Sequence, residues 1–227
     1  MKKFYRIFLL LILLITLTTF TPSELNTFPK KKNFLFKIKN VEIIENQIIN
    51  KQEIKEKLTD VYGKNIFFVK KNDLEKSLKS IEFLEKIEVK KKYPDTIIIQ
   101  IYETKPLGIF FKKNQKYLLD SSSKLIDFNK YDFFDNLPSI FGDGAEKNFV
   151  IFFKQLQNNN FPIKRINKYY YFQIGRWDIR LVNDQIIKFP PNKMAEAIQK
   201  SVELINHQDF KNQNIIDLRI HGKIVVE

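Results

Sequence analysis

Few side chains in this sequence of 227 residues have the type and spacing that enzyme chemistry requires. The run Ser121–Ser123 contains hydroxyl nucleophiles, and Glu103 and Asp217 are carboxylates that a cleft could pair. A serine nucleophile needs a base beside it, yet His207 and His221 both lie far from the serines in the sequence. A turn is therefore the simpler interpretation of the serine run. A structural or partner-facing charge is the simpler interpretation of Asp217, which lies in a strand-like alternation.

Motifs that mark common enzymes are absent from the sequence. It has no Gly-x-Ser-x-Gly nucleophile turn, no His-Glu-x-x-His metal helix and no phosphate-binding loop. It has no cysteine, so neither thiolate chemistry nor a disulfide is available. The two histidines differ too much in sequence context to suggest a pair of metal ligands. We therefore expect no catalytic, cofactor or metal site, and a non-enzymatic binding protein.

The N-terminus has the pattern of a membrane-targeting segment. Three basic residues among residues 1–6 precede an almost unbroken apolar run over residues 7–20. This pattern predicts a short cytoplasmic tail, followed by a membrane-inserted segment and an extracytoplasmic remainder of the chain. As a helix, this run would span roughly 21 Å of a hydrocarbon layer about 30 Å thick. The length fits a retained transmembrane anchor or a signal peptide, although no small-residue cleavage site follows. Residues 21–33 are polar and flanked by proline, which predicts a tether.

The net charge of +13 does not by itself indicate a nucleic-acid-binding protein. Only five of the 39 basic residues are arginine, and Lys, Asn, Ile and Phe abound, as an AT-rich genome would produce. We expect no nucleic-acid partner, because a domain beyond the membrane would rarely meet one. The cluster Lys30, Lys31 and Lys32 is instead expected to face the membrane, where anionic headgroups or solvent surround it.

The first part of the extracytoplasmic sequence predicts a small α+β domain. An alternating pattern over residues 34–43 predicts a strand with a bulge near Asn40. Asn50 and Asn72 are each followed three residues later by glutamate, which predicts the N-caps of two helices. A further strand is expected before a turn at Tyr93–Asp95, and an isoleucine-rich strand after it. The predicted order is strand, helix, helix, strand, strand.

The second part of the sequence predicts many strands and two helices. Apolar stripes at helical spacing place the helices over 145–156 and 192–205. Trp177 is expected to pack in the core against a neighbouring helix, although a binding aromatic is the alternative. A meander is predicted from three strands, over 169–174, 177–182 and 185–189. Asn183–Asp184 would form the tight turn in this meander.

The C-terminus is the candidate binding surface. Residues 215–220 and 223–227 are predicted strands, joined by a turn at His221–Gly222. A terminal strand at a sheet edge leaves N–H and C=O groups unpaired, so it can accept a strand from another chain. These residues are compatible with two roles for the terminal strand. It could form a partner-binding edge, or it could merely close the core.

Several short motifs follow one another along the chain. The first part contains Val41-Glu42-Ile43, Gly63-Lys64-Asn65-Ile66, and the segment from Tyr93-Pro94-Asp95-Thr96 to Glu103-Thr104-Lys105-Pro106. In this order they resemble the POTRA domain of the FtsQ/DivIB family of bacterial division proteins. In the second part they are similar to the family's β domain: Leu118-Leu119-Asp120, Leu137-Pro138-Ser139-Ile140-Phe141-Gly142, Arg176-Trp177-Asp178-Ile179-Arg180-Leu181, Ile187-Lys188-Phe189-Pro190 and Ile216-Asp217-Leu218-Arg219. The family often has glycine at the turns where this chain has Ser123 and Asn183–Asp184.

The resemblance implies an α+β architecture and a place in the cell. It implies a single N-terminal transmembrane helix at residues 7–20, a POTRA domain at 34–105 and an FtsQ-type β domain at 106–227. It also favours a retained anchor over a signal peptide. The chain would be a single-pass type II protein of the bacterial inner membrane, at the division septum, with its C-terminal domains in the periplasm.

The resemblance further implies a divisome scaffold that recruits FtsB and FtsL to the septum by β-strand addition. Other envelope division proteins would contact the POTRA domain. The alternative is a periplasmic POTRA-type chaperone or adaptor for outer-membrane protein assembly or secretion. Carried over residue by residue, the FtsB and FtsL docking site comprises Arg219, Ile220, His221, Gly222, Lys223, Ile224, Val225 and Val226.

Overall fold

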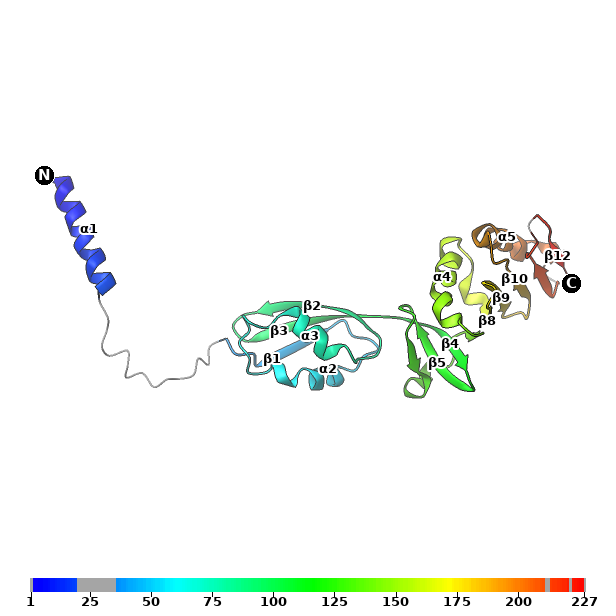
Figure 1. The fold of residues 1–227 in the computed structure, drawn as a ribbon, viewed down its shortest axis with the longest axis horizontal. Coiled ribbons are helices and arrows are strands. Elements are labelled where there is room, and N and C mark those ends of the chain that lie inside the picture. Colours follow the sequence, from blue (N-terminus) through cyan, green and yellow to red (C-terminus); the bar gives the residue numbers. More distant parts are fainter. Residues whose placement is uncertain (1, 20–35, 211–212, 221, 227) are drawn as a thin grey trace.

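The computed structural model describes residues 2–19, 36–210, 213–220 and 222–226 (Figure 1). Helix α1 covers Lys2–Thr19. No helix in this described part of the chain is both long enough and apolar enough to cross a membrane. The predicted tether and its cluster Lys30, Lys31 and Lys32 lie outside the described residues.

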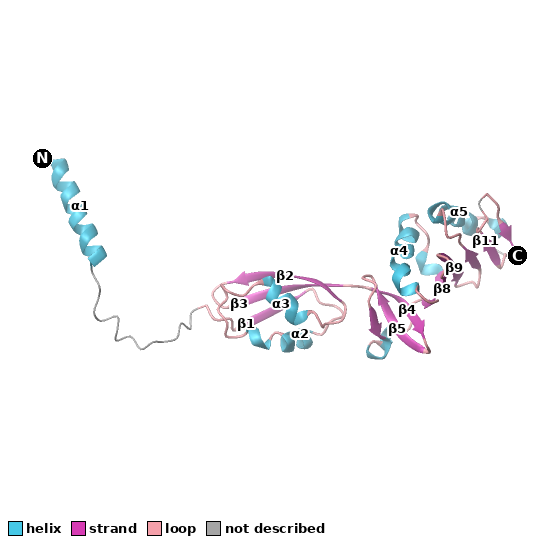
Figure 2. Ribbon diagram, in the orientation of Figure 1, coloured by secondary structure: helices cyan, strands magenta, loops and turns pink. Residues whose placement is uncertain are grey.

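The first globular part is a three-stranded sheet with two helices on one face (Figures 1 and 2). Strand β1 (Asn40–Ile44) pairs in parallel with β3 (Thr96–Glu103), and β3 pairs antiparallel with β2 (Leu84–Lys92). Helices α2 (Lys51–Lys57) and α3 (Lys71–Leu78) bury their apolar side chains against the sheet. The predicted order of strand, helix, helix, strand, strand is confirmed.

Two local details of this part differ from the sequence-based predictions. The first strand begins only at Asn40, because Phe36 has a left-handed φ of +69° and residues 36–38 instead pair with the segment after α2. The Asn50 N-cap is confirmed, since its side chain accepts from the Gln52 N–H. The second N-cap is Lys70, two residues before the predicted Asn72, and its side chain makes no capping bond.

The second globular part is a nine-stranded mixed sheet in the order β12-β11-β10-β9-β8-β7-β4-β5-β6. Its strands are β4 (Pro106–Lys112), β5 (Gln115–Asp120), β6 (Leu125–Asp127), β7 (Ser139–Phe141), β8 (Ile166–Phe172), β9 (Arg176–Leu181), β10 (Ile186–Lys188), β11 (Ile215–Asp217) and β12 (Val225–Val226). The predicted meander is confirmed, because β8, β9 and β10 pair antiparallel in sequence order. Helices α4 (Ala145–Asn158) and α5 (Met194–Asn206) confirm the two predicted helices.

An aromatic cluster holds α4 against the sheet. The Trp177 ring on β9 stacks on Phe152 of α4 with ring centroids 4.8 Å apart and planes 1° from parallel. Phe149 packs edge to face against Tyr169 on β8, with centroids 4.9 Å apart. All four side chains are buried. The core role expected for Trp177 is therefore confirmed.

The two globular parts share a packed junction. Three buried side chains of the second sheet, Ile109, Leu118 and Ile126, belong to the hydrophobic core of the first sheet. The Thr104 hydroxyl donates to Asp120 Oδ2 across the junction at 2.7 Å, and both residues are buried. This apolar contact, reinforced by a buried hydrogen bond, joins the two parts through more than the connecting strand.

Candidate partner-binding groove

The C-terminal hairpin forms one end of the nine-stranded sheet. Strand β11 pairs in parallel with β10, and β12 pairs antiparallel with β11 through Ile216↔Val226 and Asp217↔Val225. Because β12 stands at the end of the strand order, its outer edge has no neighbouring strand among the described residues. An edge of this kind presents N–H and C=O groups that another strand can use.

Asp217 and Arg219 end the regular part of β11. The Leu218 N–H still donates to Lys188 O on β10, at 2.9 Å. The Arg219 N–H instead donates to Asp217 Oδ1 at 3.0 Å, and the guanidinium forms further bonds with both carboxylate oxygens. A side chain that accepts from its own backbone two residues on competes with the strand ladder. The predicted strand over 215–220 is therefore too long, and β11 stops at Asp217.

A turn follows where the sequence predicts one. The Lys223 N–H donates to Ile220 O at 3.1 Å, which closes a turn over residues 220–223. Gly222, at the third position of this turn, has a positive φ of +74°, which glycine adopts without the steric cost of a Cβ atom. His221, the remaining residue of the predicted turn, lies outside the described residues. The strand expected over 223–227 begins only at Val225.

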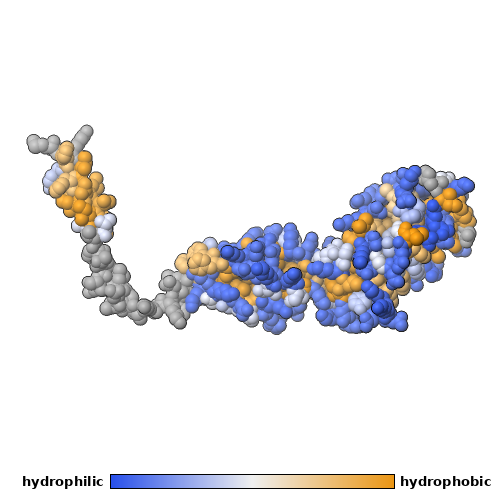
Figure 3. Space-filling view, viewed as in Figure 1, coloured by the Kyte–Doolittle hydropathy of each residue, from blue (hydrophilic) through white to orange (hydrophobic). Residues whose placement is uncertain are grey.

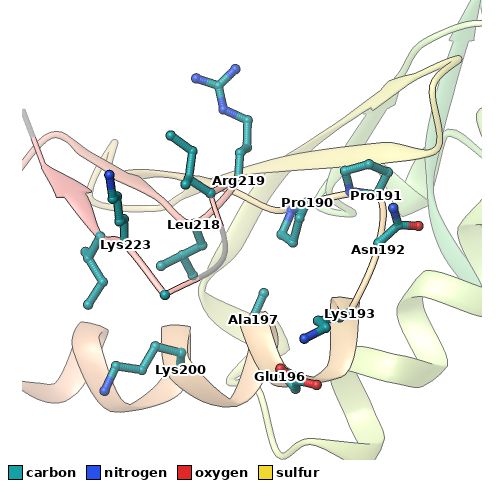
Figure 4. Close-up of a pocket in the computed structure, with 13 residues that line it drawn as sticks. Pro190, Pro191, Asn192, Lys193, Glu196, Ala197, Lys200, Leu218, Arg219 and Lys223 are labelled. Carbon is teal, nitrogen blue, oxygen red and sulfur yellow. The ribbon is translucent and has the colours of Figure 1, made fainter.

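A groove of about 600 Å³ lies between this hairpin and the start of α5 (Figure 4). Ala197, Glu196 and Lys200 stand on the α5 side, Leu218 projects towards the helix, and Arg219 points away from it. The groove is lined by Pro190, Pro191, Asn192, Lys193, Glu196, Ala197, Lys200, Leu218, Arg219, Ile220, Gly222, Lys223 and Ile224. Its floor is apolar because Ala197 and Leu218 are buried there.

The rim of the groove combines exposed apolar side chains with positive charge. Ile220 is 58% exposed and Ile224 is 40% exposed, which is unusual for isoleucine in a folded domain. Figure 3 shows apolar surface at this end of the molecule. Four basic residues line the groove beside a single carboxylate, which belongs to Glu196. Two of the four basic residues already form ion pairs, Arg219 with Asp217 and Lys200 with Glu203. The groove is therefore suited first of all to a partner segment with apolar anchors.

Two aspartates beneath the hairpin have shifted pKa values in opposite directions. Burial raises the pKa of Asp217, but the hydrogen bonds and the charge of Arg219 lower it by a larger amount, so the resulting pKa lies below the ordinary value. Burial raises the pKa of Asp178, and the nearby Arg176, Lys188 and Arg219 only partly offset this. The Arg219 guanidinium is thus neutralised mainly by Asp217.

The structure brings together most of the predicted partner-binding residues. Arg219, Ile220, Gly222, Lys223 and Ile224 line the groove. Val225 and Val226 form the edge strand beside it. No binding role was predicted for the groove residues that lie before and within α5. Pro190–Pro191 before the helix, followed by charges at helical spacing at 193, 196 and 200, was the available signal.

The other residues considered for chemistry have structural partners. The Glu103 carboxylate accepts from the backbone N–H groups of Gln47, Ile48 and Ile49, at 2.9 to 3.1 Å. Within the serine run, Ser122 donates to Asp120 from its N–H and its hydroxyl. Groups of three or more metal-ligating side chains are absent from the described part of the chain.

Two protein-family models match consecutive parts of the chain. Residues 36–104 match the FtsQ-type POTRA domain. Residues 109–219 match the C-terminal domain of the cell division protein FtsQ/DivIB. The second match ends at Arg219, so the outer part of the hairpin lies beyond it.

Curated relatives agree with these matches. The chain is 28% identical over 195 residues to the cell division protein FtsQ of Rickettsia conorii, covering 85% of this chain and 72% of that protein. It is 27% identical over 199 residues to the Bartonella bacilliformis FtsQ, covering 84% and 63% of the two chains. Matches to division proteins do not favour the alternative of an outer-membrane assembly factor. The chain belongs to the FtsQ/DivIB family of cell division proteins, whose members are non-enzymatic scaffolds that act with other division proteins at the membrane of the division site.

Proposed function

We propose that this chain is a divisome scaffold that binds the FtsB–FtsL pair through the groove and the free edge of β12, and so recruits the pair to the septum. In this proposal residues 1–6 are cytoplasmic, residues 7–20 are a retained inner-membrane anchor and residues 21–33 are a periplasmic tether. The POTRA domain, 34–105, contacts other envelope division proteins. The β domain, 106–227, carries the FtsB–FtsL site.

The free edge of β12 is the observation that carries the proposal. The backbone carbonyl of Lys188 on β10 accepts from the Leu218 N–H, so Leu218 and Ile216 direct their N–H and C=O groups towards β10. Asp217, between them, directs its groups towards its partner Val225 on β12. By the same alternation Val226 directs its N–H and C=O away from β11. A partner strand can therefore pair with β12 without displacing any bond of the existing sheet.

The groove adds selectivity to this backbone pairing. Backbone bonds are the same for every sequence, so they cannot distinguish one partner from another. Ile220 and Ile224 offer exposed apolar contacts beside the strand, and Lys223 adds a positive charge to the same lining. An extended segment with apolar anchors and neighbouring carboxylates fits both features. The extracytoplasmic part of the FtsB–FtsL pair is the proposed source of that segment.

A matched pair of charge substitutions tests the proposal. The extracytoplasmic FtsB–FtsL pair from the same bacterium is titrated calorimetrically against the full chain in detergent. Ile220→Asp places a carboxylate in the groove and is expected to weaken binding about tenfold or more. Ile151→Asp is the control, since Ile151 is similarly exposed, at 62%, but lies on α4. Equal affinity for both variants, or no binding by the unmodified chain, would refute the proposal.

A further inference from the structure

The first globular part exposes a cluster of aromatic rings at the end where the chain enters it. The Phe36 and Phe67 ring centroids lie 4.9 Å apart, and Phe67 stacks on Tyr93 at 5.0 Å. Phe68, the next residue, is 80% exposed, and the other three rings are each more than a third exposed. Large aromatic side chains normally bury most of their surface, so three exposed rings in contact, with a fourth exposed ring on the adjacent residue, indicate a surface used for contact.

The backbone around these rings is firmly held. The Ile66 N–H donates to Phe36 O at 2.9 Å, and Lys37 pairs with Asn65 in an antiparallel bridge. The Phe67 N–H donates to Asn65 Oδ1 at 2.9 Å. The Lys91 ammonium donates to Phe67 O at 3.2 Å, which ties the segment after α2 to the end of β2. The rings are therefore displayed on a fixed surface.

Positive charge surrounds the aromatic cluster. Its three segments, 36–39, 64–70 and 90–95, contain seven lysines and one carboxylate, that of Asp95. Asp95 forms an ion pair with Lys39, with Nζ 3.5 Å from Oδ2. Lys92 forms a second ion pair, with its Nζ 3.9 Å from Glu42 Oε1. The seven lysines of these segments still outnumber the two carboxylates in these ion pairs. A surface with rings at its centre and lysines around them complements an anionic layer with an apolar interior.

The position of the cluster along the chain favours a membrane as that layer. Phe36 is the first residue described after α1 and residues 20–35. Those sixteen residues can extend over at most about 60 Å, so the cluster lies within reach of wherever α1 resides. Figure 3 shows apolar surface on this N-terminal end of the first globular part.

We propose that Phe36, Phe67, Phe68 and Tyr93 dock on the headgroup region of an anionic phospholipid bilayer, with the surrounding lysines on the lipid phosphates. Tyrosine favours this interfacial layer, exposed phenylalanine rings can insert at the boundary between headgroups and acyl chains, and each nearby lysine adds attraction to anionic lipid. Docking would fix the orientation of the POTRA domain relative to the membrane. It would thereby set the direction in which the C-terminal groove is presented. This inference rests on the proposed membrane anchor.

Depth-dependent fluorescence quenching in vesicles tests the docking. The chain has no cysteine, so Phe68→Cys in the full chain can carry a single environment-sensitive dye. Ile151→Cys on α4 is the labelled control with comparable exposure. Both proteins are reconstituted in vesicles of phosphatidylethanolamine and phosphatidylglycerol that contain a headgroup-proximal spin-labelled lipid. The dye at position 68 is expected to be quenched about twofold more than the dye at 151.

Variants separate the cluster from its surroundings. Phe67→Ser combined with Tyr93→Ser should reduce quenching at position 68 to the level of the control, with thermal melting used to verify the fold. Replacing phosphatidylglycerol by phosphatidylcholine should weaken quenching, because the lysines lose their anionic partners. Equal quenching at 68 and 151 in the unmodified background would overturn the inference and leave a protein partner as the occupant of the cluster.

A carbonate wash of the same vesicles separates this result from the anchor. Retention of the chain with equal quenching at both positions refutes the docking alone. Release of the chain refutes the proposed anchor, while the quenching ratio measured before the wash still decides the docking. The carbonate wash therefore tests the anchor, and the quenching ratio tests the docking.

Discussion

The Asp217 carboxylate holds Arg219 by its backbone N–H and by its guanidinium at the same time. Because both bonds go to one side chain, Arg219 leaves the strand ladder and the hairpin loop begins there. The loop then carries Ile220 and Ile224 to the rim of the groove. A single aspartate thus shapes the proposed binding surface and neutralises the basic residue nearest to it.

We expect the Asp217–Arg219 pair to make a pH-dependent contribution to stability. Burial raises the pKa of Asp217, but Arg219 lowers it by a larger amount, so the folded-state pKa lies below the unfolded value of about 3.9. The contribution is therefore present above about pH 4 and is lost as the pH falls through the folded pKa. Asp217→Asn should lower the melting temperature at pH 7, and its difference from the unmodified chain should shrink as the pH falls below about 4 in scanning calorimetry.

A double-mutant cycle checks the origin of that effect. Arg219→Gln combined with Asp217→Asn should cost little more than Asp217→Asn alone, because each substitution removes the ion pair between the guanidinium and the carboxylate. Additive losses would show that Arg219 acts through other contacts. A gap between Asp217→Asn and the unmodified chain that persists at the lowest pH would contradict the assignment to the ionised carboxylate.

Asp120 is expected to be a main stabilising group at the junction of the two globular parts. It is fully buried and accepts from the Thr104 hydroxyl, from the Ser122 N–H and hydroxyl, and from the Lys124 N–H. Asp120→Ala leaves these donors unsatisfied and should cost about 2–4 kcal/mol in urea unfolding. Thr104→Val removes only the bond across the junction and should cost about 1–2 kcal/mol. A smaller loss for Asp120→Ala than for Thr104→Val would contradict this assignment.

Ser123 is a site where glycine should stabilise the chain. Its φ is +66°, a left-handed conformation that disfavours residues with a Cβ atom. Ser123→Gly is therefore expected to raise stability by about 0.5–1 kcal/mol, measured by thermal melting. Ser122→Gly is the matched control and should lower stability, because the Ser122 hydroxyl donates to Asp120. Equal effects of the two substitutions would show that φ does not determine the outcome.

Local sequence patterns were sufficient to predict most of the elements. Each strand of the meander and each of the helices α4 and α5 buries one face. Their apolar residues therefore recur with the period of a strand or of a helix, which can be read in the sequence. Trp177 was correctly expected in the core for the same reason. The start of α3 was predicted two residues late, because asparagine is a favoured capping residue, whereas the observed N-cap, Lys70, has extended backbone angles and no capping side-chain bond.

The binding groove could be predicted only in part. The hairpin residues were identified from their position at the C-terminus and from the family resemblance. The α5 side of the groove comes from residues about 25 positions earlier in the chain, and its contact with the hairpin depends on the parallel pairing of β10 with β11. A parallel crossover of this kind leaves no short-range signal in the sequence. The same holds for Phe36, Phe67 and Tyr93, which three separate segments bring together.

The most direct test of the proposed strand addition is a proline that removes an N–H from the outer edge of β12. Val226→Pro removes the N–H that we infer points away from β11, and Val226→Thr keeps that N–H and changes only the side chain. Affinity of the full chain for the extracytoplasmic FtsB–FtsL pair is measured by calorimetry for both variants. The proposal predicts binding about tenfold weaker for Val226→Pro and nearly unchanged for Val226→Thr. Equal affinities for the proline and threonine variants would contradict the account.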